Sequence, residues 1–142
     1  MSHIIQISVF LENKSGRLAE VLGSLGNENL KINALTIADT SEYGILRLIV
    51  NNFPHAIKVL KAKEFVVTTT EVVALSIPNQ AGSFASVLQA LADKNLSVEY
   101  MYAFKWSTQA VLILRPENLE KALDILTQHE FKILDAEDLE NL

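Results

Sequence analysis

Cysteine is absent from this chain of 142 residues. Without a thiol the protein cannot form disulfide bonds, thiolate metal sites or a cysteine nucleophile, and its composition is compatible with the cytosol. Glycine and proline are scarce, at five and three residues, and no segment rich in proline, glycine or serine separates one part of the chain from another. We therefore expect structural units that are joined tightly rather than by a flexible linker.

Positive charge is also in short supply, because 12 basic residues face 17 acidic ones and the net charge is −5. Nothing resembles the basic stripe that neutralises phosphates, so nucleic acid is not an expected partner. The longest apolar runs, such as ILRLIV at residues 45–50, are too short to span a bilayer. The first residues, MSHIIQISVF, lack the charged segment and long apolar run of a secretory signal. These features predict a cytoplasmic protein with no membrane partner.

One segment of the sequence occurs twice. Residues 12–32 (ENKSGRLAEVLGSLGNENLKI) and residues 78–98 (PNQAGSFASVLQALADKNLSV) are 66 positions apart and identical at eight of 21 aligned positions. Composition alone would give roughly one or two matches. The same offset keeps the rest of the chain in register without a gap, which indicates a tandem duplication.

Each half of the chain has the same pattern of expected elements. A strand leads through Gly16 or Gly82 into a helix with apolar residues at i, i+3, i+4 and i+7, and two strands, a second helix and a last strand follow. This order, β-α-β-β-α-β, predicts an α+β fold of two ferredoxin-like units, residues 1–70 and 71–142. A unit of 70 residues is marginal alone, so we expect the two to pack side by side. Asn29 and Asn95 are the expected left-handed residues after the first helix of each half.

The repeated motif resembles that of the ACT domain, an amino-acid-sensing module of metabolic enzymes and regulators. The family pattern, D/N-x-P-G-x-L-x-x-V-L followed by G-[IL]-N-I, appears here as NKSGRLAEVL…NLKI and NQAGSFASVL…NLSV. The resemblance covers both halves and implies a non-catalytic regulatory protein that binds a free amino acid between paired domains. The family's proline is replaced by Ser15 and Ala81. Its asparagine at the second strand is replaced by Lys31 and Ser97.

The glycine turns are the expected ligand sites. Glycine lets a ligand approach the backbone closely, and the first amide groups of a helix attract a carboxylate. In the family, the loop of one domain faces the second strand of the other. The candidate ligand-binding residues are therefore Asn13, Ser15, Gly16, Arg17 and Leu18 in the first loop, Asn79, Gly82, Ser83 and Phe84 in the second, and Val98, Tyr100 and Met101 on a facing strand.

We expect the first loop to be the better site, because Arg17 adds a positive charge and Phe84 fills space in the second. Tyr100 on the facing wall favours an amino acid with an aromatic or planar side chain. In the alternative reading, the chain is an interaction subunit that binds no ligand and docks on a metabolic enzyme, or on a second copy of itself. Its docking surface would be an aromatic face of Val98, Tyr100, Tyr102, Phe104 and Trp106.

No nucleophile–base pair, phosphate loop or cofactor fingerprint occurs in the sequence, so neither catalysis nor a cofactor is expected. His3, His55 and His129 lack partners at metal-ligand spacing. The last residues, DAEDLENL, are interpreted as a solvated acidic tail. The sequence leaves open which amino acid is bound, which process is regulated and what the oligomeric state is.

Overall fold

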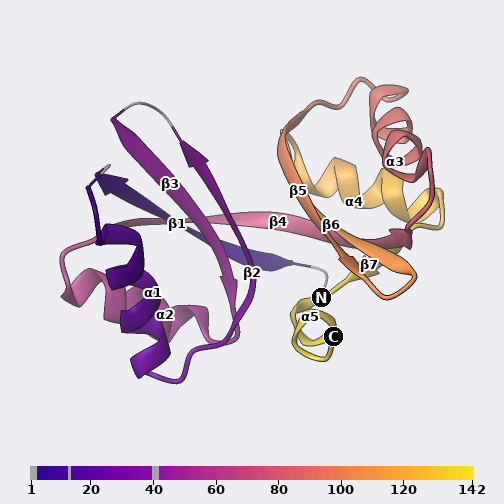
Figure 1. Ribbon diagram of the computed structural model, residues 1–142. Helices are drawn as coiled ribbons and strands as arrows, with labels where there is room; N and C mark the ends of the chain where they lie inside the picture. The colour runs from indigo at the N-terminus through magenta and orange to yellow at the C-terminus, as the bar shows by residue number, and fades with distance from the viewer. Residues whose placement is uncertain (1–2, 13, 40–41) are drawn as a thin grey trace. The chain divides into compact units, whose positions relative to one another are not determined.

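The computed structural model describes residues 3–12, 14–39 and 42–142. The chain divides into two compact units (Figure 1). Residues 5–70 form one, here called the N-terminal unit, and residues 71–142 together with His3 and Ile4 belong to the other, the C-terminal unit.

The N-terminal unit is a sheet with two helices on one face (Figure 1). Its elements are β1 (Ile4–Glu12), α1 (Arg17–Asn27), β2 (Ile32–Asp39), β3 (Tyr43–Val50), α2 (Phe53–Ala62) and the first part of β4 (Val66–Pro78). The strand order is β2-β3-β1-β4, with β3 antiparallel to both β1 and β2. Alternate residues of β1, including Ile7, Val9 and Leu11, are buried beneath the apolar stripe of α1.

The C-terminal unit repeats this arrangement. It contains the rest of β4, then α3 (Ser83–Ala92), β5 (Val98–Trp106), β6 (Gln109–Pro116), α4 (Leu119–Gln128), β7 (Lys132–Leu134) and α5 (Ala136–Glu140). The strand order is β7-β4-β6-β5, and β6 is antiparallel to both β4 and β5. The core lies between the sheet and the two long helices. The predicted α+β fold of two β-α-β-β-α-β units is confirmed.

Equivalent turns of the two units have equivalent backbone angles. Gly16 and Gly82 have φ of 87° and 86° and immediately precede α1 and α3. Asn29 and Asn95, with φ of 56° and 57°, adopt the predicted left-handed conformation after those helices. The duplication therefore reproduces the turns as well as the elements.

The last strand of the first half and the first strand of the second form one continuous strand of 13 residues, β4, which passes through the boundary at residues 70–71. One expectation about the end of the chain needs correction. The acidic tail is not wholly solvated, because its residues form α5, in which Leu139 is only 3% exposed. Asp135 and Asp138 form a capping box that fixes the start of this helix.

Candidate functional site

The turn between β1 and α1 presents an uncapped helix N-terminus. Gly16 precedes the helix, and no described side chain caps it. The same holds for Gly82 and α3. In contrast, Asn52 and Asn118 cap α2 and α4 by accepting hydrogen bonds from first-turn backbone amides. The backbone amide of Arg17 donates to the carbonyl oxygen of Lys14, so the amides of the next residues of α1 are the ones that can donate to an acceptor from outside the helix, at the positive end of its dipole.

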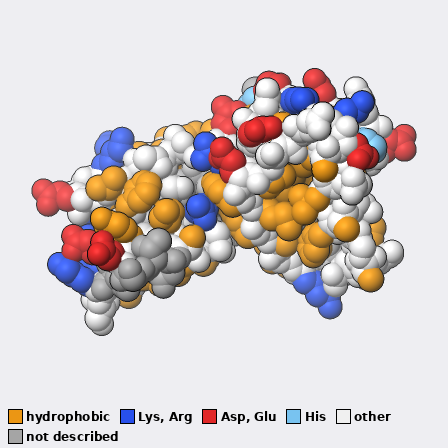
Figure 2. Space-filling view, turned by 90° about the horizontal axis from the view of Figure 1, so that it is seen from above, with side chains coloured by type: hydrophobic (Ala, Val, Ile, Leu, Met, Phe, Trp, Pro, Cys, Tyr) orange, Lys and Arg blue, Asp and Glu red, His pale blue; other side chains and the backbone are white. Residues whose placement is uncertain are grey.

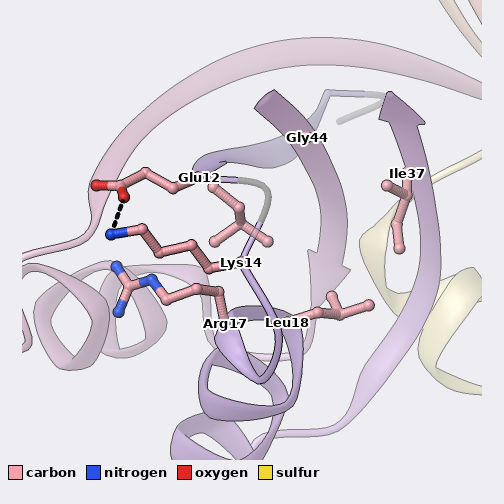
Figure 3. Close-up of a pocket in the computed structure, with 7 residues that line it drawn as sticks. Glu12, Lys14, Arg17, Leu18, Ile37 and Gly44 are labelled. Carbon is pink, nitrogen blue, oxygen red and sulfur yellow. Dashed lines mark ion pairs between the residues drawn. The ribbon is translucent and has the colours of Figure 1, made fainter. Parts of the chain in front are cut away.

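A pocket of about 190 Å³ opens at this turn, within the N-terminal unit (Figure 3). Figure 3 shows Glu12, Lys14 and Arg17 extending to one side of the turn, whereas Leu18 and Ile37 lie on the other. The pocket thus has a charged side and an aliphatic side. Its lining residues come from β1, the turn, α1, β2 and β3: Leu11, Glu12, Lys14, Arg17, Leu18, Ile37 and Gly44.

Both signs of charge are present on the charged side. The ammonium of Lys14 lies 2.8 Å from a carboxylate oxygen of Glu12. The hydrogen bond from Lys14, and then its positive charge, lower the pKa of Glu12, with a smaller contribution from Arg17. The Arg17 guanidinium lies 3.0 Å from Glu20 and stacks 4.5 Å from the centre of the Phe65 ring. Exposed ion pairs are weak, so a ligand can compete for both cations.

The second glycine turn has the same backbone geometry but different chemistry. At the positions equivalent to Glu12, Lys14 and Arg17 the C-terminal unit has residues without charge: Pro78, Gln80 and Ser83. Phe84, which is 39% exposed, replaces Leu18. The two turns therefore differ in charge rather than in conformation.

The structure brings together part of the predicted site. Arg17 and Leu18 line the pocket, and Gly16 forms the turn beside it. Ser15 is exposed in the same turn without being one of the lining residues, and Asn13 lies outside the described residues. At the second turn, Asn79 is the first residue after β4, Gly82 immediately precedes α3, and Ser83 and Phe84 are the first two residues of that helix.

Five lining residues were not predicted, namely Leu11, Glu12, Lys14, Ile37 and Gly44. Glu12 and Lys14 could have been found from the repeat itself. Its two copies differ in charge at these positions, although their glycines and helices match.

The expected facing strand has a different geometry from the one predicted. A register shift between Val98 and Tyr100 shows that β5 has a bulge there. Val98 consequently packs against the core of the C-terminal unit, and its predicted place on the aromatic face is wrong. Tyr100 and Met101 are consecutive on the strand and point to opposite faces. A ligand contact of these three residues stays a prediction.

The histidines contact carboxylates or an aromatic ring. The Nδ1 and Nε2 atoms of His3 lie 3.0 Å and 3.2 Å from Glu71 and Glu120, and His55 Nε2 lies 3.2 Å from Glu28. His129 stacks on its neighbouring aromatic residue. Within residues 3–12, 14–39 and 42–142, no cluster of three His, Asp or Glu side chains could hold a metal ion. No helix of this same part of the chain is long and apolar enough to cross a bilayer.

Comparisons with known proteins give a consistent result. The family model for the ACT domain pair matches residues 2–142. The crystal structure of protein BT0572 from Bacteroides thetaiotaomicron is 42% identical, with a TM-score of 0.95 over 99% of this chain and 98% of that one. The regulatory subunit of aspartate kinase from Thermus thermophilus is 15% identical, with a TM-score of 0.66 over 90% of this chain and 93% of that one, which is a likeness of fold alone. No curated protein matches the sequence.

Proposed function

Because this chain belongs to the ACT domain family, as a pair of such domains, we propose that it is a non-catalytic regulatory protein that binds a free amino acid at the turn between β1 and α1. ACT domain pairs are typically regulatory and ligand-binding. One observation carries the proposal for this chain: the pocket combines an uncapped helix N-terminus with side chains of both charges.

A free amino acid is a zwitterion, and the charged side of the pocket complements both of its ends. The carboxylate would accept hydrogen bonds from the first amides of α1 and from Lys14 or Arg17. The ammonium group would lie against the carboxylate of Glu12, which is ionised at neutral pH. Such a site needs no structural change beyond the release of weak, exposed ion pairs.

The second glycine turn serves as an internal comparison for this proposal. Gly82 also precedes an uncapped helix, but Pro78, Gln80 and Ser83 can supply neither a charged partner for the ammonium group nor one for the carboxylate. If amides alone were sufficient, the two turns would bind equally. We propose that the charges make the first turn the ligand site.

A calorimetric survey of the twenty amino acids tests this function. We expect at least one to bind with a dissociation constant between about a micromolar and a millimolar, without being consumed. The double substitution Lys14→Gln with Arg17→Ser copies the second turn and should weaken binding roughly tenfold or more, because charged hydrogen bonds are lost. The matched control, Gln80→Ala with Ser83→Ala, should bind as the unchanged protein does. Absence of binding by a folded protein would refute the proposal.

An interaction subunit is the second candidate, and the exposed apolar side chains favour it. Figure 2 shows hydrophobic side chains on the surface of both units. Trp106 and Met101 on β5, and Leu35 and Ile37 on β2, are exposed on strands at the ends of the strand order. Such edges are sites where another chain can pair. A partner enzyme or a second copy that co-purifies, with no response to any amino acid, would support this candidate instead.

A further inference from the structure

We infer that the pocket at the β1–α1 turn selects an amino acid with a branched aliphatic side chain, and that Gly44 sets the size limit. The inference rests on the proposed function and adds the class of ligand. It replaces the expectation of an aromatic or planar ligand, which depended on Tyr100.

The aliphatic side of the pocket carries the first part of the inference. Leu11 is buried, Leu18 packs against the N-terminal core, and Ile37 is partly open to solvent. The described lining residues on this side include no hydroxyl, amide or aromatic group. A polar ligand side chain would lose its hydrogen bonds to water here without replacement, whereas an aliphatic one gains by leaving water.

The pocket is small, and its volume indicates the size of ligand that it can hold. A cavity of about 150 Å³ holds benzene, so about 190 Å³ corresponds to roughly eight non-hydrogen atoms. Valine is of that size, and leucine and isoleucine exceed it by one carbon atom. Phenylalanine, tyrosine and tryptophan are larger, and glycine and alanine would leave the aliphatic side uncovered.

Gly44 keeps this space open. Side chains alternate along a strand, and Leu46 and Leu48 of β3 face the N-terminal core. A side chain at Gly44 would therefore point to the same face, beside its direct partner on β1, Leu11. The equivalent residue in the C-terminal unit is Ala110, which is 3% exposed and part of the core. The second copy thus accommodates a methyl group at this strand position.

Titration of glycine, alanine, valine, leucine, phenylalanine and glutamine into the unchanged protein and into Gly44→Ala tests the inference. One methylene in an apolar pocket changes discrimination by about 10–200-fold. Because this pocket is partly open, we expect about a tenfold preference for valine or leucine over glycine. Gly44→Ala should lower the affinity for the preferred branched amino acid by about tenfold, and the affinity for glycine much less. Gly23→Ala is the control, since a methyl group there meets nothing within 4 Å.

The outcomes separate this inference from the proposed function. Tighter binding of phenylalanine or glutamine than of valine and leucine, or unchanged affinities in Gly44→Ala, would overturn the aliphatic assignment and leave amino-acid binding intact. Absence of binding by all amino acids would reject both. If circular dichroism shows that Gly44→Ala does not fold, Ile37→Ala gives the same test from a partly exposed position. The affinity for leucine should fall about tenfold in Ile37→Ala, and an unchanged affinity would overturn the inference.

Discussion

The carboxylate of Glu12 and the ammonium of Lys14 lie 2.8 Å apart at the end of β1, on the rim of the pocket. The two residues flank position 13, so opposite charges stand together where a zwitterion would need them. The equivalent residues of the second copy, Pro78 and Gln80, carry no charge. This difference between otherwise matching turns is the basis of our functional assignment.

Substitution of Lys14 by glutamine should raise the pKa of Glu12 towards its ordinary value, because Lys14 provides the largest contributions that lower it. A glutamate whose pKa is lowered by folding stabilises the folded protein at pH values above the pKa that the same group has in the unfolded chain. The contribution is lost as the pH falls through the lowered value. An NMR titration of the Glu12 carboxyl measures the change. Lys61→Gln on α2 is the control, and an equal pKa in Lys14→Gln and the unchanged protein would contradict the interpretation.

Alanine substitutions at Gly16 and Gly82 should destabilise the protein equally but affect binding unequally. Both residues have a left-handed φ near 87°, and an added Cβ meets nothing within 4 Å. The cost is therefore backbone strain, about 1–2 kcal/mol for each, because an added methyl group has no neighbour to displace. Only Gly16→Ala should weaken amino-acid binding, and Gly16→Val should abolish it.

Chemical denaturation and calorimetry on the same samples measure both effects. Gly16→Asn provides the matched control, since asparagine tolerates this conformation better than alanine. Equal losses of binding from the substitutions at Gly16 and Gly82, or a loss only at Gly82, would contradict the assignment to the first turn.

Features that depend on local sequence were largely predictable. The spacing of Leu18, Val21, Leu22 and Leu25 places one apolar stripe on α1, and the repeat gave equivalent turns at both glycines. Glu64 and Glu130 also have positive φ, at 66° and 62°. Glutamate rarely adopts this conformation, so nothing in the sequence indicates a positive φ at these two positions. Here the surrounding fold overrides the preference of the residue.

Features that depend on strand register were not predictable. Ile37 and Gly44 reach the pocket because β2 and β3 pair beside β1, and the sequence alone does not give that register. The bulge that turns Val98 towards the core interrupts an alternation that otherwise looks regular.

Leu139→Ala in α5 should lower the free energy of unfolding by about 2–5 kcal/mol, the range for a buried leucine. Leu139 is 3% exposed, although it lies in an acidic segment that the sequence alone suggested was solvated. Leu142→Ala is the matched control, because Leu142 is 38% exposed and should cost far less. Urea denaturation of both variants measures the difference. Equal effects would show that α5 is not packed on its unit in solution.

The central claim is that an amino acid occupies the first glycine turn, and amide chemical shifts test it most directly. We would record the backbone amide NMR spectrum while adding the amino acid that binds most tightly in the calorimetric survey. The largest shift changes should occur at residues 14–19 and at Gly44, with little change at residues 80–85. Changes centred on residues 80–85, or an unchanged spectrum at saturating ligand, would contradict the claim.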